Sequence, residues 1–367
     1  MTKPELAAAA PVRPGEELDW PRVAAYLQAR LPGLDGGLEV LQFPNGSANL
    51  TYLLRFGGRP LVLRRPPFGR LAPGAHDMAR EYRVLSRLWQ AFPPAPRALL
   101  LCEDQDIIGA TFFVMEFRPG VVIWDEIPEP MRHHTDVARR VGFAVIRALA
   151  DLHQVDYVSC GLAGLGRPDG FVARQVRGWR GRWEMVAPGA AGPARPLMHE
   201  VADMLELTLP QPQRAAILHN DPKLDNCQFD PADPDRVHSV FDWDMATLGD
   251  PLVDVGILLN YWPDPAAAPG DEGFYPPGQD RLGLPSRHEI LAAYASATGL
   301  DLAGIGWYQA FACWKTAVVL QQLHDRYLRG ETSDERMASR GDRVAELAAR
   351  ARRLLGKDVG IEDELGL

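Results

Sequence analysis

The most informative part of the sequence lies at residues 218–251, LHNDPKLDNCQFDPADPDRVHSVFDWDMATLGDP. Asp221 follows a histidine by two positions, Asn226 follows Asp221 by five, and Asp242 ends an apolar run that predicts a short strand. Chemistry that moves a phosphoryl group needs one carboxylate to take a hydroxyl proton, and a carboxamide and a second carboxylate to hold metal ions. The order of these side chains fits those roles. Lys223, two residues beyond Asp221, is suited to contact the transferring phosphoryl group.

The whole stretch is more specific than its parts. A histidine two residues before an aspartate is common in loops, and a chance match is easy. Here the pair follows an apolar segment, residues 215–218, that predicts a short strand, and a predicted hairpin then leads to the strand that ends at Asp242. The hairpin would bring Asn226 and Asp242 close together. We therefore interpret the stretch as a phosphotransferase site, with Asp221, Lys223 and Asn226 as its catalytic residues.

Composition limits the class of protein. The chain has 367 residues, which is long for one domain, and 39 Lys and Arg against 48 Asp and Glu give a net charge of −9. A balance this acidic argues against nucleic acid as the main partner. The four cysteines lie far apart and form no CxxC pair, so we expect neither a zinc site nor a disulfide framework. The N-terminal segment resembles neither a signal peptide nor a membrane span, and we expect a cytoplasmic protein with no membrane partner. The sequence leaves the oligomeric state open.

The elements predict two lobes of an α+β protein. Residues 18–31 and 75–89 have helical periodicity, and residues 38–43, 49–56, 60–65, 95–104 and 111–120 predict strands of an antiparallel sheet. We place an N-terminal lobe at 1–118, with a loose arm at 1–16, and a larger, mainly helical lobe at 119–367. Its first helices are expected at 135–153, 170–183 and 196–210.

The segment FPNGSANLTY, residues 43–52, joins the first two predicted strands. Its backbone amides and Ser47 are suited to cradle phosphates. The plain alternative is a β-turn with no ligand, because Asn-Gly is the strongest hairpin dipeptide.

Together these motifs resemble the aminoglycoside phosphotransferase and choline kinase superfamily, which has a two-lobed protein-kinase-like fold. The HxDxxxxN loop followed by DWDMATLGDP carries the resemblance, and residues 43–52 resemble the GGxSNxTY loop of the superfamily. LRRPP, AREYRVL, CEDQDIIGATFFVMEF and RQVRGW extend it over most of the chain. These stretches are similar to a branch related to the kinase-like domain that is fused to acyl-CoA dehydrogenases. The departures are Asn45 and Asn220, where glycine is usual, and Asp244, where glutamate is usual.

The resemblance implies ATP and Mg²⁺ as cofactors and a small hydroxylated compound as the other substrate. Arg64 stands where a kinase has the lysine that holds the donor phosphates, and Glu81 stands where the acid that pairs with it is found. The alternative for both is an ordinary solvated charge. Residues Asn226, Asp242 and Asp244 are the expected metal ligands, although Asp244 is equally suited to cap its loop. The other expected nucleotide contacts are Ser47, Asn49, Glu116 and Phe117.

The acceptor is expected to be anionic. Residues 166–183, GRPDGFVARQVRGWRGRW, correspond to the region near the acceptor in the family and carry five arginines against one aspartate. Aminoglycosides are polycations, whereas this segment suits an anion, with Arg174, Arg177 and Trp179 as contacts and Trp183 as a second stacking face. The relation to acyl-CoA-dehydrogenase-linked kinases makes a hydroxyacyl-CoA our hypothesis. The alternative is that these arginines only solvate a helix or pair with nearby acids.

Two other readings stay open. The first is an aminoglycoside-type or other small-molecule kinase. The second is a pseudokinase that binds nucleotide without transfer, which the arginine at position 64 favours and the presence of Asp221, Asn226 and Asp242 opposes. An acyl-CoA dehydrogenase proper lacks support, because the sequence has no flavin-type motif.

Overall fold

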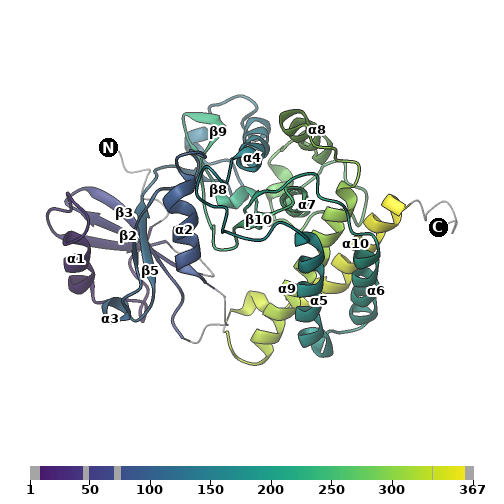
Figure 1. Cartoon of the computed structure of the whole chain (residues 1–367), viewed down its shortest axis with the longest axis horizontal. Coiled ribbons are helices and arrows are strands. Elements are labelled where there is room, and N and C mark those ends of the chain that lie inside the picture. Colours follow the sequence, from purple (N-terminus) through teal and green to yellow (C-terminus); the bar gives the residue numbers. More distant parts are fainter. Residues whose placement is uncertain (1–8, 44–48, 70–75, 333, 360–367) are drawn as a thin grey trace.

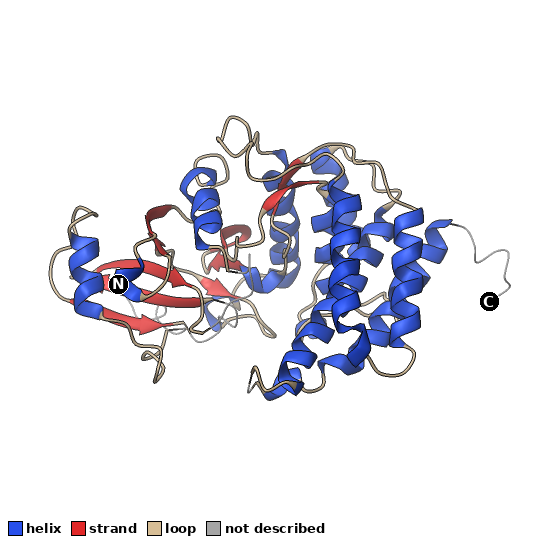
Figure 2. Ribbon diagram, turned by 60° about the horizontal axis from the view of Figure 1, so that its bottom comes forward, coloured by secondary structure: helices blue, strands red, loops and turns tan. Residues whose placement is uncertain are grey.

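The protein is described by a computed structural model that covers residues 9–43, 49–69, 76–332 and 334–359. It has a small lobe built on an antiparallel sheet and a larger lobe that is mostly helical (Figures 1 and 2). This is the two-lobed architecture expected from the sequence.

The small lobe is a five-stranded antiparallel sheet of order β1-β2-β3-β5-β4. Its strands are short because turn residues interrupt each apolar run. At the turn between β2 and β3, Gly57 has a φ of 56° and Gly58 of 114°, and a Cβ on Gly57 would lie 2.6 Å from the Asp35 carbonyl oxygen. The strands are β1 (Leu38–Gln42), β2 (Leu50–Phe56), β3 (Arg59–Arg65), β4 (Ala98–Cys102) and β5 (Phe112–Glu116). The last two are shorter than the predicted 95–104 and 111–120.

Helices cover both faces of this sheet. Helix α1 (Trp20–Gln28) and the short α3 (Gln105–Ile108) lie on the outer face, and α2 (Met78–Leu88) lies on the face toward the large lobe (Figure 1). Asp19 and Asp77 cap α1 and α2, each accepting a hydrogen bond from a backbone amide of the first turn. The apolar side chains of α2 pack into the main core of the large lobe. The inner face of the sheet therefore lies against the large lobe.

The expected loose arm at 1–16 is ordered where the structure describes it, over residues 9–16. Ala10 and Gln42 exchange backbone hydrogen bonds of 2.9 and 2.7 Å, so the arm pairs with the edge of β1. The Tyr52 hydroxyl donates to the Glu16 carbonyl at 2.7 Å. An alanine- and proline-rich composition did not reveal these contacts, because they use backbone groups and a distant tyrosine.

The large lobe begins where the chain leaves the five-stranded sheet. After Glu116, strand β6 (Val121–Val122) pairs with β8 in the large lobe, so the change of sheet falls between residues 116 and 121. The lobe boundary that we predict at 118 lies in this connection. Two small sheets, β6-β8-β9 and β10-β7, hold the loops of the 218–251 stretch. Their strands are β7 (Ala216–Leu218), β8 (Cys227–Asp230), β9 (Asp233–Val240) and β10 (Thr247–Gly249).

Helices surround these small sheets. Helix α7 approaches α9 so closely that a Cβ on Gly256 would lie 2.4 Å from the Tyr308 carbonyl oxygen. Helices α7 and α9 are buried on several sides, which explains why their sequences lack a clear polar face. Within the described parts of the chain, no helix combines the length and the apolar character needed to span a membrane. The helices are α4 (Val137–Gln154), α5 (Phe171–Val186), α6 (Ala194–Leu207), α7 (Leu252–Tyr261), α8 (Arg287–Thr298), α9 (Ile305–Leu328) and α10 (Val344–Val359).

Candidate active site

The loop after β7 carries the predicted catalytic residues. Asn220 adopts a left-handed φ of 66°, which asparagine tolerates better than most residues with a Cβ. Its side-chain amide donates to the Met245 carbonyl at 2.9 Å. These two facts explain how asparagine replaces the usual glycine here: the backbone keeps the same turn, and the side chain connects the loop to the segment after Asp242.

Asp254 of α7 holds this loop from below. Its carboxylate is fully buried and accepts from the backbone amides of His219, at 2.7 Å, and Asn220, at 2.8 Å. His153 at the end of α4 lies 3.2 Å from the same carboxylate and 2.7 Å from the Tyr294 hydroxyl. His153 is therefore a buried histidine with two partners, as expected of a structural residue.

Asp221, Lys223 and Asn226 meet at one point. Lys223 Nζ lies 2.8 Å from Asp221 Oδ2, and Asn226 Nδ2 donates to the same oxygen at 3.1 Å and to the Asp221 carbonyl at 2.9 Å. Both side-chain contacts go to Oδ2, and no described residue is hydrogen-bonded to Oδ1. Oδ1 of Asp221 thus has no hydrogen-bond partner among the described residues, and Asn226 turns its amide nitrogen toward Asp221.

Two hydrogen bonds hold the catalytic loop beside the loop of Asp242. His219 Nε2 lies 2.7 Å from the Phe241 carbonyl oxygen, and the Phe241 amide donates to the Asn226 carbonyl at 2.9 Å. Asp242 itself has a φ of 66°, a strained conformation for a residue with a side chain. The strain is held by contacts on both sides, and it directs the Asp242 carboxylate toward the small lobe.

Arg64 of β3 meets that carboxylate. Its Nε lies 3.1 Å from Glu81 Oε1 on α2, and its Nη2 lies 3.0 Å from Asp242 Oδ1. The predicted ion pair between Arg64 and Glu81 is confirmed. The alternative, in which both side chains are ordinary solvated charges, is wrong, because Glu81 is only 1% exposed. The contact with Asp242 was not predicted. Arginine explains it, since its planar fork reaches two carboxylates at once where a lysine presents one ammonium.

The charges in this cluster oppose one another. Burial raises the pKa of Glu81 to about 7, although Arg64 acts in the opposite direction. Burial also favours a raised pKa for Asp242, but Arg64, His219 and Lys223 hold it below its ordinary value, so Asp242 is ionised. Burial and the neighbouring Asp242 charge raise the pKa of Asp244. Asp242 is therefore the member of this cluster whose pKa is lowered, and its expected metal role stays a prediction.

The oxygen donors present suit magnesium. Among the described residues no group of three or more His, Cys, Asp or Glu is arranged to hold a metal. Mg²⁺ does not need one, because it is commonly bound by one or two carboxylates, water and phosphate oxygens. Asp242 and the free amide oxygen of Asn226 supply that set, and Asp244 stands near Asp242.

The remaining nucleotide contacts are placed as follows. Asn49 is buried, and its Oδ1 lies 2.8 Å from His76 Nδ1, while its Nδ2 has no hydrogen-bond partner among the described residues. Ser47 lies outside the described residues. Glu116 ends β5, and its side chain accepts from the Arg97 amide and from Arg118. Phe117 follows at the connection between the lobes. Their contacts with a nucleotide stay predictions.

The predicted acceptor residues lie on α5. Arg177 is exposed, and the Arg174 guanidinium donates to the carbonyls of Asp169 and Arg167 at the start of the helix. Trp179, which is 6% exposed, and Trp183, which is fully buried, both belong to the apolar core of the large lobe. The expected second stacking face at Trp183 is therefore wrong, because its ring points into the large lobe. The arginine pairing that we kept as an alternative holds for Arg180, which forms ion pairs with Asp203 and Glu206.

Sequence reasoning missed Lys315 of α9. Its Nζ donates to the Asn220 carbonyl at 3.2 Å, directly beside the catalytic loop, and lies 5.5 Å from the Trp179 ring centroid. Lys315 is 95 residues from Asn220 in the sequence and lies in a helix with no clear polar face. The one sequence signal for its role is that a lysine stands within a helix that is otherwise largely apolar and buried.

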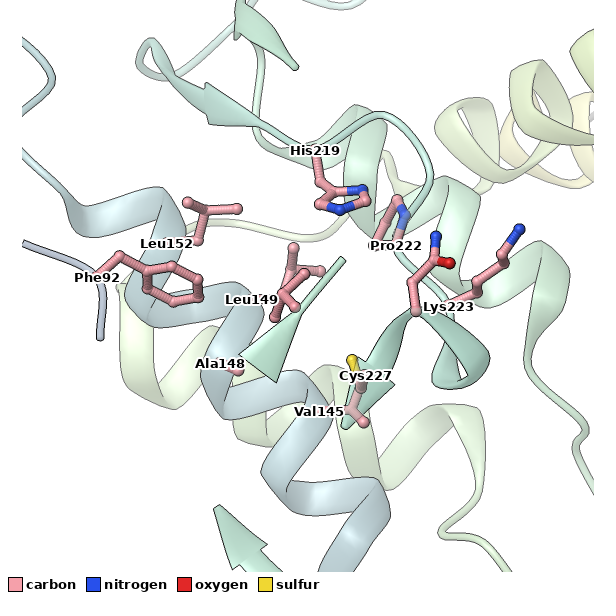
Figure 3. Close-up of a pocket in the computed structure, with 11 residues that line it drawn as sticks. Phe92, Val145, Ala148, Leu149, Leu152, His219, Pro222, Lys223 and Cys227 are labelled. Atoms are coloured by element: carbon pink, nitrogen blue, oxygen red, sulfur yellow. The ribbon is translucent and has the colours of Figure 1, made fainter. Parts of the chain in front are cut away.

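A cavity of about 30 Å³ lies beneath the catalytic loop. Apolar side chains of α4 line it from one side and His219 and Pro222 from the other, and Lys223 extends away from it (Figure 3). It has room for a water molecule or two and not for a nucleotide. Lys223 also lines the cavity, although its ammonium group points away from it, and the cavity is part of the support beneath the loop.

Comparisons with known proteins identify the family of the chain. The model of the phosphotransferase enzyme family matches residues 39–290. Mouse acyl-CoA dehydrogenase family member 10 is 34% identical over 85% of this chain, and chicken family member 11 is 33% identical over 88%. The chain spans only 29% and 42% of the length of these two relatives.

Solved structures show the same fold. A Ralstonia eutropha protein provisionally named an aminoglycoside phosphotransferase has a TM-score of 0.76 at 29% identity, covering 93% of this chain and 99% of its own. A thermostable mutant of the aminoglycoside phosphotransferase APH(4)-Ia, in complex with AMP-PNP and hygromycin B, has a TM-score of 0.57 at 17% identity, covering 92% of this chain and 99% of its own. The chain has the protein-kinase-like fold and belongs to the phosphotransferase enzyme family.

Proposed function

We propose that this protein is an ATP- and Mg²⁺-dependent kinase that phosphorylates a hydroxyl group of an anionic small molecule, with a hydroxyacyl-CoA as the acceptor class. The observation that carries the proposal is the arrangement of Asp221, Lys223 and Asn226 on one loop, held beside Asp242 and the Arg64–Glu81 pair. This set supplies a base, a cation and oxygen ligands within one site.

Each residue has a chemical role in the proposal. Asp221 accepts the hydroxyl proton of the acceptor on Oδ1, while Lys223 and Asn226 fix the carboxylate through Oδ2. Lys223 also faces the charge that develops on the transferring phosphoryl group. Burial acts to lower the pKa of Lys223, but Asp221 and Asp225 raise it above its ordinary value, so the ammonium stays charged.

Arg64, Asn226 and Asp242 form the donor side. Arg64 contacts the phosphates of the nucleotide, and Asn226 and Asp242 hold the metal. A magnesium ion bound there would neutralise phosphate charge. Arg64 is now paired with Asp242, so it must exchange that contact for the phosphates when nucleotide binds.

The acceptor class rests on charge and on the relatives. Two curated relatives are named acyl-CoA dehydrogenase family members, and the chain matches less than half of each. An acyl-CoA carries several phosphates, and α5 presents Arg174 and Arg177 on its partly or fully exposed surface. An aminoglycoside, a polycation, would instead require carboxylates at the acceptor side.

The test measures phosphate transfer from γ-labelled ATP to a panel of hydroxyacyl-CoA thioesters and to a panel of aminoglycosides, with and without Mg²⁺. We expect magnesium-dependent transfer to at least one thioester and none in the Asp221→Asn variant. Transfer to aminoglycosides alone would refute the acceptor class. No transfer to any acceptor, together with magnesium-dependent nucleotide binding, would favour the second candidate.

That second candidate is a nucleotide-binding protein without transfer activity. The ion pair between Arg64 and Asp242 favours this second candidate, because Arg64 then occupies the carboxylate that would hold the metal. Nucleotide binding measured by calorimetry with and without Mg²⁺ separates the candidates when combined with the transfer assay.

A further inference from the structure

Lys315 occupies an unusual place beside the catalytic loop. It lies on α9, is only partly exposed, and donates one hydrogen bond, to the Asn220 carbonyl at 3.2 Å. An ammonium group has three donors, so this bond leaves two. Burial lowers the pKa of Lys315, and the charges of Asp221 and Asp254 act in the opposite direction.

A second cation adjoins Lys315. The Arg182 guanidinium carbon lies 4.3 Å from the Trp179 ring centroid, and Lys315 Nζ lies 5.5 Å from the same centroid. The Arg182 charge also contributes to the lowered pKa of Lys315, so the two cations repel each other. Both cations lie within cation–π distance of the Trp179 ring, which holds them near each other.

Neither cation is neutralised by an ion pair. In the described parts of the chain no carboxylate lies within ion-pair distance of Lys315 or Arg182, whereas Arg180 on the same helix pairs with Asp203 and Glu206. Lys315 and Arg182 repel each other, and an anion that contacts both of them would offset this repulsion.

We propose that Lys315, Arg182 and the ring of Trp179 form a binding subsite for an oxyanion of the acceptor, a phosphate or a carboxylate, next to the catalytic loop. This inference rests on the proposed kinase function and identifies where the charge of its acceptor binds. The same two charges disfavour a polycationic acceptor.

Direct binding tests the subsite without any turnover. Calorimetry would measure the affinity of the protein for coenzyme A, for 3-hydroxybutyrate, and for pantetheine, which lacks the phosphates. We expect coenzyme A or 3-hydroxybutyrate to bind, and the one that binds identifies the source of the anion. Lys315→Met and Arg182→Met should each weaken that affinity about 10- to 100-fold, because each removes one charge-assisted contact. Lys315→Arg should retain most of it.

Two controls make the comparison specific. Arg326→Met removes an exposed cation from the same helix and should leave anion binding unchanged. Arg182 is exposed, so its variant decides the matter if Lys315→Met fails to fold. The subsite is refuted if the wild-type protein binds neither anion. It is also refuted if Arg182→Met binds the anion as tightly as Arg326→Met does, or if pantetheine binding falls as much as anion binding in the Lys315→Met and Arg182→Met variants.

Transfer activity then separates the subsite from the proposed function. A protein that binds the anion through Lys315 and Arg182 but transfers no phosphate contradicts the kinase activity and supports the subsite. A protein that phosphorylates neutral hydroxyl compounds as well as anionic ones, with the same KM in both variants, contradicts the subsite alone. A lower kcat for every acceptor in Lys315→Met, with KM unchanged, would mean that Lys315 only positions the loop.

Discussion

Asp254→Asn should destabilise the fold by about 2–4 kcal/mol. The Asp254 carboxylate accepts from two backbone amides, those of His219 at 2.7 Å and Asn220 at 2.8 Å, and all three groups are buried. An asparagine keeps one acceptor and presents an NH₂ group to the other amide. Losing a hydrogen bond to a charged acceptor costs about 1.5–3 kcal/mol, and the buried amide left without an acceptor adds about 1 kcal/mol or more.

Urea unfolding, followed by circular dichroism, measures this loss. Asp203→Asn is the matched control, because Asp203 is an exposed partner of Arg180 and such pairs contribute about 1 kcal/mol or less. The transfer rate of Asp254→Asn should also fall about 100-fold in the protein that remains folded, because the loop no longer holds Asp221 in place. A loss of stability no larger than that of the control would refute the idea that Asp254 supports the loop through its charge.

Three further outcomes follow from the site. Asp221→Asn should lower transfer by about two to four powers of ten with nucleotide affinity nearly unchanged, and full turnover would remove Asp221 from its role as base. Asp242→Ala should abolish the magnesium dependence of nucleotide binding, measured by calorimetry; equal strengthening by magnesium in variant and wild type would show that another residue is the ligand. Glu81 has a folded pKa of about 7 against 4.5 in an unfolded chain, so protonation stabilises the fold: this contribution is complete below pH 4.5 and is lost as pH rises through 7. Between pH 5 and pH 8 the wild type should therefore lose up to about 3 kcal/mol of unfolding free energy relative to Glu81→Gln, and parallel stability curves would contradict the raised pKa.

The parts of the site that are local in sequence could be predicted. Asp221, Lys223 and Asn226 lie within six residues, so their spacing alone brings them together once the loop follows a strand. The pairing of Arg64 with Glu81 was also reached, but through the family resemblance rather than through periodicity. A strand-end arginine and a helix-face glutamate look the same in sequence whether they face water or each other.

The parts that depend on tertiary packing could not be predicted. Lys315 reaches the Asn220 carbonyl because α9 passes beneath the loop, and a helix buried on several sides has no polar stripe to show which face meets it. Trp183 appeared equivalent to Trp179 because both lie on α5, four residues apart. Only the packing of α5 makes Trp183 fully buried and brings the Trp179 ring to within 5.5 Å of Lys315 Nζ.

The inner face of the small lobe belongs to the same apolar core as the large lobe. Val84, Leu85 and Leu88 of α2, together with Phe113 and Met115 of β5, form one cluster with the helices of the large lobe. The two lobes should therefore melt in a single cooperative transition rather than in two. A fragment that starts at residue 119 would leave the partner face of this cluster open to water, so we expect it to aggregate on expression. Directed evolution of this protein, or fusion of its lobes to other proteins, should keep the chain whole across the connection at 116–121.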